Sequence, residues 1–76
     1  MLRVVLWGPG QMGIGALRAV IQHPGLELVG LVVHSGHKEG RDAGELCGLP
    51  PTGVLATRDV HAALAIDADV VAYFAT

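Results

Sequence analysis

The sequence predicts an α/β fold of the Rossmann type, in which a parallel sheet is covered by helices on both faces. Three observations predict it: apolar runs of strand length, helical segments that alternate with them, and a glycine-rich turn between the first run and the first helix. Strands that alternate with helices pair in parallel through right-handed crossovers. We expect residues 1–76 to be the first part of such a domain, because the last apolar run has no covering element after it.

The first half of the chain is predicted to form a strand, a helix and a second strand. Leu2–Trp7 is an apolar run with β-branched residues, which is typical of a strand buried on both faces. Gln11–Gln22 carries apolar residues at helical spacing, and the His-Pro-Gly segment at 23–25 ends that helix. Glu27–Val33 is a second buried strand, and the polar segment His34–Arg41 is a loop.

The second half carries weaker signals. Asp42 can cap a short helical turn that Gly48 closes. Val54–Ala56 is a short third strand, and Asp59 can cap a short helix over Val60–Ala65. These assignments keep the alternation of strands and helices that a parallel sheet needs.

The apolar run Val70–Ala75 predicts a last strand, again buried on both faces. Its two aromatic residues, Tyr73 and Phe74, point to opposite faces, and both are expected to pack in a core. Ala75 and Thr76 lie at the carboxyl end of this strand. Since open parallel sheets bind ligands beyond these ends, we expect this tip to face a cofactor.

The composition excludes several classes of function. The net charge is −2 with no basic block, which argues against nucleic acid as a partner. No apolar run approaches the length of a membrane span. The one cysteine, Cys47, is interpreted as a small buried hydrophobic residue and fits a reducing compartment. No secretory signal is visible, so a cytoplasmic location is expected.

The turn after the first strand, GPGQMG, matches the pattern G-x-G-x-x-G between a strand and a helix. Gly8 would allow the tight turn out of the strand, and Gly10 would let a pyrophosphate lie against bare backbone. Gly13 would let the helix pack close to the sheet. The N–H groups of Gln11, Met12 and Gly13 would point at the phosphates, helped by the positive end of the helix dipole.

An alternative stays open for these glycines, since they could serve only close packing between strand and helix. Gly15 lies outside the motif and is expected to be a helix–sheet packing position rather than a ligand contact. A Walker-type phosphate loop is excluded, because no Gly-Lys-Ser/Thr follows the turn.

The end of the second strand lacks the Asp or Glu with which NAD-binding domains hold the ribose 2′-OH. Hydroxyl, imidazole and cationic side chains gather in the loop instead, namely His34, Ser35, His37, Lys38 and Arg41. Such donors suit a 2′-phosphate, so NADP(H) is favoured. NAD(H) stays as the alternative because Glu39 could bind a ribose hydroxyl. A solvated loop with no ligand role also stays open.

No metal site is predicted. His34, His37 and Cys47 match no ligand spacing that is typical of a metal site, and a structural zinc site has four ligands.

Four segments, VVLWGPGQMG, HPGLELVG, GRDAGELCG and ADVVAYFAT, resemble the amino-terminal domain of the dihydrodipicolinate reductase-like family. The nearer resemblance is to its branch of 2,4-diaminopentanoate dehydrogenase and related NAD(P)-dependent amine dehydrogenases. The resemblance covers essentially the whole chain. The glycine turn is shared by many dehydrogenases, whereas the DAGEL turn after the HSGHKEGR loop is more specific to this branch.

The resemblance implies a two-domain oxidoreductase that moves hydride between NAD(P)H and an imine, amine or conjugated C=N substrate. It implies cofactor contacts at the positions that match the family: Gly8, Gly10, Gln11, Met12, Gly13, Ser35, Lys38, Ala75 and Thr76. Substrate binding, proton donation and homo-oligomer formation belong to a carboxyl-terminal domain outside this chain. No catalytic residue is therefore assigned.

Two other functions are compatible with the same turn. One is a non-catalytic module that senses a dinucleotide and switches a partner. The other is a domain that binds coenzyme A or a sugar nucleotide. A fold alone does not separate these functions.

Overall fold

The computed structural model describes residues 1–8, 13–34 and 36–73. Strands and helices alternate along these residues, which confirms the predicted α/β class. The elements in chain order are β1 (Leu2–Trp7), α1 (Gly13–Gln22), β2 (Leu26–Val32), α2 (Ala43–Leu46), β3 (Ala56–Thr57), α3 (Val60–Leu64) and β4 (Val70–Tyr73).

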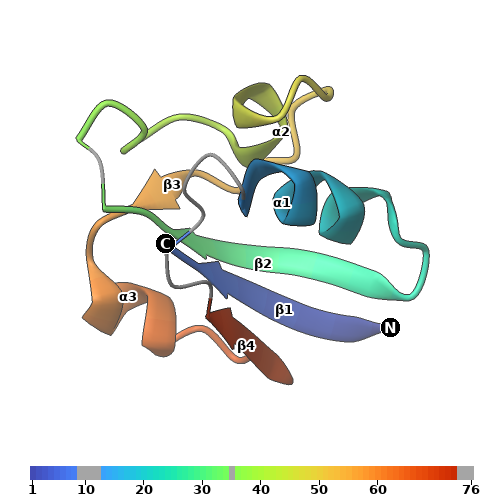
Figure 1. Ribbon diagram of the computed structural model, residues 1–76. Helices are drawn as coiled ribbons and strands as arrows, with labels where there is room; N and C mark the ends of the chain where they lie inside the picture. The colour runs from blue at the N-terminus through green and yellow to red at the C-terminus, as the bar shows by residue number, and fades with distance from the viewer. Residues whose placement is uncertain (9–12, 35, 74–76) are drawn as a thin grey trace.

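The four strands form one parallel sheet in the order β3-β2-β1-β4 (Figure 1). The register is regular except between β1 and β2, where Val4 pairs with Leu28 and Val5 pairs with Gly30. Because all the strands are parallel, their carboxyl ends meet on one side of the sheet. We call this side the carboxyl edge, and it is the side on which such folds bind ligands.

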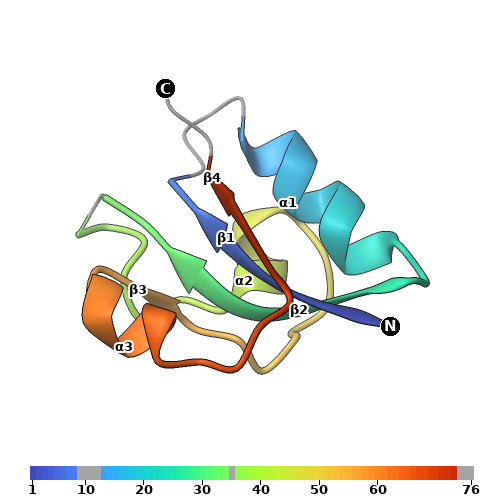
Figure 2. The same ribbon diagram turned by 90° about the horizontal axis from the view of Figure 1, so that it is seen from below.

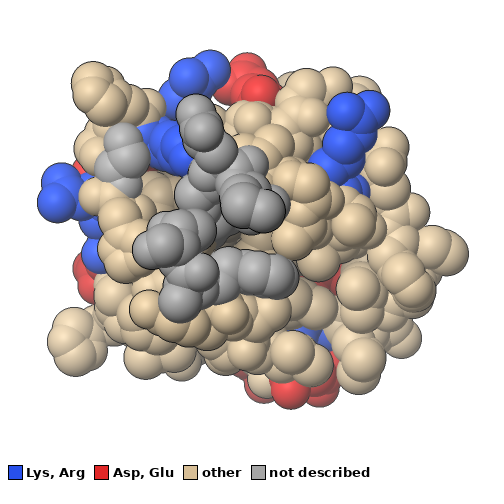
Figure 3. Space-filling model, viewed as in Figure 1, with Lys and Arg blue, Asp and Glu red and all other residues tan. Residues whose placement is uncertain are grey.

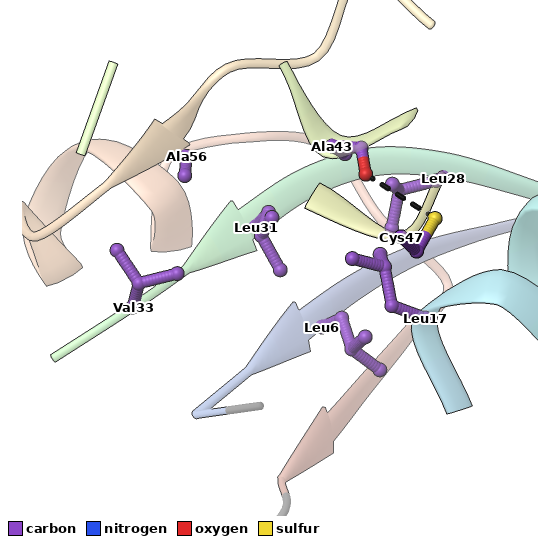
Figure 4. Packing of buried hydrophobic residues seen from close by; sticks show 8 residues of the cluster. All are labelled: Leu6, Leu17, Leu28, Leu31, Val33, Ala43, Cys47 and Ala56. Carbon is purple, nitrogen blue, oxygen red and sulfur yellow. Dashed lines mark hydrogen bonds between the residues drawn. The ribbon is translucent and has the colours of Figure 1, made fainter. Parts of the chain in front are cut away.

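Alternating side chains of the strands divide the core between the two faces of the sheet. One face lies beneath α1 and α2 and holds the larger cluster, drawn in Figure 4: Leu6, Leu17, Leu28, Leu31, Val33, Ala43, Cys47 and Ala56. Cys47 is buried, as predicted, and its Sγ donates to the carbonyl oxygen of Ala43 at 3.4 Å. The thiol therefore fills space in the core beneath α2.

The opposite face packs against α3. Val5, Val32 and Ala63 are buried there, and partly buried side chains such as Trp7 and Val60 surround them. With α1 and α2 above the sheet and α3 below it, helices cover both faces as the sequence predicted (Figure 1).

Two short helices begin at the caps that the sequence predicted. Asp42 accepts from the backbone N–H of Gly44 at 2.8 Å, and Asp59 accepts from that of Ala62 at 3.0 Å. Gly48 follows α2 with a φ of 77°, in the left-handed region that favours glycine.

The third strand is shifted from its predicted position. The sequence placed it at Val54–Ala56, but β3 is Ala56–Thr57. Residues before it pair with the segment that leads into α2: Leu55 forms an antiparallel bridge with Asp42, and the N–H of Ala56 donates to the carbonyl of Arg41. These antiparallel contacts occupy the strand's first residues, so parallel pairing with β2 starts later.

The last strand is not buried on both faces, which corrects the prediction for Val70–Ala75. Val70 and Val71 are 40% and 47% exposed, and Tyr73 is 61% exposed rather than part of a core. In the described sheet, β4 pairs only with β1 and forms an edge. Figure 2, seen from below, shows β4 in front of the other strands. Phe74 lies outside the described residues.

The packing role expected for Gly15 is wrong. Gly15 is exposed on α1, and a Cβ atom built on it would meet no described atom within 4 Å. Its position on the solvent side of the helix explains why it contributes nothing to helix–sheet packing.

Candidate functional site

The turn at the end of β1 begins with the conformation that its glycine predicts. Gly8 is buried and has a φ of 78°, in the left-handed region. Its N–H donates to the carbonyl of Val32 at 2.8 Å, which ties the end of β1 to the end of β2. The chain thus leaves the sheet sharply at the carboxyl edge. Gly10, Gln11 and Met12 lie outside the described residues.

Helix α1 starts at Gly13 and has no acidic side chain in its first turn. The first N–H groups of a helix have no partner within the helix, and the helix dipole makes this end positive. An acidic side chain there would compete with a bound anion. Its absence leaves this helix end chemically suited to a phosphate.

The loop after β2 brings further candidates to the same edge. His34 is exposed directly after Val33, whose N–H donates to the carbonyl of Thr57 at 2.9 Å. His37 is exposed and Lys38 is half-buried, while Ser35 lies outside the described residues. The loops that follow β2 and β3 therefore lie side by side.

Glu39 links these two loops by bonding to Arg58, a residue to which the sequence pattern assigned no role. Its Oε2 accepts from the backbone N–H of Arg58 at 3.1 Å. The Arg58 side chain turns toward Gly36, since a Cβ atom built on Gly36 would lie 3.7 Å from Arg58 Nη1. Figure 3 shows Lys and Arg side chains gathered on the left of the molecule, where the carboxyl edge lies.

Sequence reasoning missed Arg58 because the third strand was placed too early. If the strand ended at Ala56, Arg58 would lie in the segment that leads into α3. With β3 ending at Thr57, Arg58 is the first residue beyond a strand tip. The sequence feature that could have pointed to Arg58 is its place as a basic residue between an apolar strand and the helix cap Asp59.

An aromatic pair lies where β1 and β4 end. Trp7 and Tyr73 are partners in register, with ring centroids 5.4 Å apart and an interplanar angle of 80°. The indole Nε1 of Trp7 is buried and has no hydrogen-bond partner within the described ranges. A buried donor without an acceptor costs about 1–3 kcal/mol, and this donor counts as unsatisfied only among the described residues. The neighbouring candidates Ala75 and Thr76 lie outside the described residues.

A buried carboxylate holds the segments behind the site together. Asp42 accepts from the backbone N–H groups of Gly44, Thr52 and Gly53, each at 2.8 Å, and from Thr52 Oγ1 at 3.1 Å. The Thr52 N–H contributes most to lowering the pKa of Asp42, burial opposes it, and the N–H groups of Gly44 and Gly53 lower the pKa further. The charged form of Asp42 therefore fits this structure best.

The described part of the chain offers no metal centre, because no three of its His, Cys, Asp and Glu side chains converge closely enough to hold an ion. Within the same residues, none of the helices is long and apolar enough to cross a membrane.

Comparison with known proteins gives the family. Residues 2–76 match the family described as dihydrodipicolinate reductase, N-terminus. The chain belongs to this family. The match confirms the family resemblance that the sequence indicated. The relatives of this chain are named as a dehydrogenase and a reductase.

Three relatives illustrate the likeness to this dihydrodipicolinate reductase N-terminus family. An amine dehydrogenase of Streptomyces virginiae is 47% identical over all of this chain and 21% of its own length. A 4-hydroxy-tetrahydrodipicolinate reductase of Anaeromyxobacter sp. (strain Fw109-5) is 47% identical over 97% of this chain and 27% of its own. The solved structure of amine dehydrogenase from Mycobacterium smegmatis matches 83% of this chain with a TM-score of 0.72 and 31% identity.

The chain spans about a fifth to a quarter of the length of these relatives. The shared part is the α/β unit with the glycine turn.

Proposed function

We propose that this chain is the dinucleotide-binding part of an NAD(P)H-dependent oxidoreductase acting on a C=N or amine substrate. The observation that carries the proposal is the turn at Gly8: a left-handed glycine at the carboxyl edge, followed by a helix without an acidic first turn, in a member of a reductase family. The amine and reductase chemistry in the names of its relatives supports the substrate class.

The chemistry of the edge fits the proposed cofactor. Gln11, Met12 and Gly13 would hold its pyrophosphate through backbone N–H groups, Gly8 and Gly10 would shape the turn around it, and Ala75 and Thr76 would approach it from the end of β4. These features favour a bound ligand over glycines that serve packing alone.

NADP(H) is the form we propose. His34, Ser35, His37 and Lys38 follow β2, where a carboxylate would select a free ribose hydroxyl. Imidazole, hydroxyl and ammonium groups are donors that suit a 2′-phosphate. The carboxylate of Glu39, the candidate for NAD(H), already accepts from the Arg58 backbone at 3.1 Å.

The bound nicotinamide supplies the hydride, and this chain's residues bind and orient the cofactor. Substrate contacts and proton donation are proposed for another domain, with no residue of this chain assigned to them. The cytoplasmic location and the homo-oligomer expected from the sequence remain part of the proposal.

The experiment is a calorimetric titration of the purified protein with NADPH, NADH and coenzyme A. We expect NADPH to bind and coenzyme A not to bind. Gly10→Val should abolish NADPH binding by filling the pyrophosphate space, whereas Gly15→Ala, on the exposed side of α1, should leave it unchanged. Binding of coenzyme A alone, or unaltered affinity in Gly10→Val, would contradict the proposal.

A dinucleotide-sensing module would bind the same ligand. The discriminating measurement is NADPH oxidation, followed at its absorbance band, in the presence of imine substrates. Turnover with an imine supports the enzyme, and tight NADPH binding without turnover of any imine supports the sensor.

A further inference from the structure

We propose that Arg58, at the tip of β3, selects NADP(H) by binding its 2′-phosphate. The inference rests on the proposed function and deepens it, because it names the residue that distinguishes the two cofactors. Nothing in the sequence pattern assigned Arg58 a role. Three observations carry the inference: where β3 ends, where the guanidinium lies, and what Glu39 binds.

The first observation is the position of Arg58 relative to the loop after β2. Val32 and Thr57 are partners in the parallel ladder, and the N–H of Val33 donates to the carbonyl of Thr57 at 2.9 Å. Arg58 follows Thr57 directly, just as His34 follows Val33. The two residues therefore leave neighbouring strand tips on the carboxyl edge.

The second observation is the direction of the side chain. Arg58 Nη1 lies 3.7 Å from the position that a Cβ atom would occupy on Gly36. Arg58 is exposed, and the described residues offer its guanidinium neither a hydrogen bond nor an ion pair. A cation that has no partner among the described residues thus lies over the loop that carries the predicted 2′-phosphate ligands.

The third observation concerns the nearest acid. Glu39 accepts from the backbone N–H of Arg58 at 3.1 Å. This bond holds the Arg58 backbone against the loop, while the guanidinium makes no ion pair with Glu39 within 4.0 Å. Glu39 therefore positions Arg58 without neutralising it through a direct ion pair.

A guanidinium is well suited to a phosphate monoester. It is planar, stays charged at any physiological pH, and can donate two parallel hydrogen bonds to phosphate oxygens. A ribose hydroxyl offers no negative charge for the same group. Arg58 should accordingly strengthen binding of NADPH and leave NADH nearly unaffected.

The test compares Arg58→Gln with Arg18→Gln, which removes the same charge from an exposed position on α1. Dissociation constants for NADPH, NADH, adenosine 2′,5′-bisphosphate and 5′-AMP are measured by calorimetry at low ionic strength, where exposed charges are least screened. We expect Arg58→Gln to weaken both 2′-phosphate ligands about tenfold, as loss of a charge-assisted bond would. The dissociation constants of NADH and 5′-AMP should change less than about twofold. Arg18→Gln should change none of the four dissociation constants.

Gly36→Asp is a second variant that leaves Arg58 in place. Gly36 is not among the glycines of the described residues with a left-handed φ, and a side chain there reaches the guanidinium at ordinary contact distance. The new carboxylate should pair with Arg58 and weaken NADPH binding. In the double variant Gly36→Asp/Arg58→Gln, part of this effect should disappear, because the two changes act on one interaction.

The outcomes separate this inference from the proposed function. If NADPH binds but Arg58→Gln weakens NADPH and NADH equally, or neither, Arg58 has no part in selection while dinucleotide binding stands. If the unaltered protein binds NADPH and NADH with equal affinity, the inference fails in the same way. If it binds neither, the proposed function and the inference fail together.

Discussion

Trp7 and Tyr73 meet edge to face at the carboxyl ends of β1 and β4, with their ring centroids 5.4 Å apart. The contact joins the strand that leads into the glycine turn to the strand at the sheet edge. Trp7 is the only tryptophan in the sequence, so its emission reports directly on this edge.

The first prediction concerns this pair. Tyr73→Ala should lower the free energy of unfolding by about 0.5–1.5 kcal/mol, because an aromatic contact beyond simple burial is lost. Urea denaturation followed by Trp7 fluorescence measures the change. Tyr73→Phe keeps the ring and should remain close to the unaltered protein. If Tyr73→Ala and Tyr73→Phe are equally stable, the ring contact does not stabilise the edge.

A second prediction follows from the lowered pKa of Asp42. A carboxyl group with a lower pKa in the folded state stabilises the protein above its unfolded pKa, which is about 3.9 for Asp. This contribution is lost as the pH falls below about 4 toward the folded pKa. Thermal unfolding between pH 7 and pH 3 should therefore show a steeper loss of Tm in the unaltered protein than in Asp42→Asn.

The control for this pH dependence is Asp67→Asn. Asp67 has a side chain that is 98% exposed and contacts only Arg3 across 3.6 Å among the described ion pairs. Its substitution should leave the pH profile of Tm almost unchanged. A profile for Asp42→Asn that runs parallel to that of the unaltered protein would show that Asp42 is not the titrating group.

The third prediction contrasts two glycines. In Gly44→Ala, the new Cβ atom would overlap the backbone carbonyl of Pro50, which has little freedom to move away. We expect a loss of about 1–3 kcal/mol in the free energy of unfolding, as for other overpacked positions. In Gly15→Ala, the Cβ atom enters open space on α1, and the better helix propensity should add about 1 kcal/mol. Chemical denaturation of both variants tests the difference, and effects of the same sign would argue against it.

The fourth prediction addresses the loop after β2. Lys38→Glu should weaken NADPH more than NADH, by about tenfold or more, because a carboxylate repels the 2′-phosphate where an ammonium group would bind it. Arg18→Glu introduces the same charge change on α1 and should affect the two cofactors equally. Fluorescence titration gives both affinities. Equal losses for NADPH and NADH in Lys38→Glu would remove Lys38 from the 2′-phosphate site.

The sequence by itself determined the order of elements, the helix caps and the class of ligand expected at the turn. These features depend on residues close together in the chain: alternating apolar runs mark the strands, Asp42 and Asp59 accept from N–H groups two or three residues later, and Gly8 adopts a left-handed φ at the end of a strand. Local chemistry of this kind is readable without knowing which segments meet.

Tertiary structure alone decided which strand tips become neighbours. Leu55 forms an antiparallel bridge with Asp42, and the N–H of Ala56 donates to the carbonyl of Arg41, so that β3 begins only at Ala56. The pairing of Val32 with Thr57 ends β3 at Thr57 and so places Arg58 at a strand tip beside the loop after β2, and pairing with β1 leaves β4 at an exposed edge of the described sheet. Hydrophobic periodicity does not encode such contacts, because they depend on the register between strands and on bonds between distant segments.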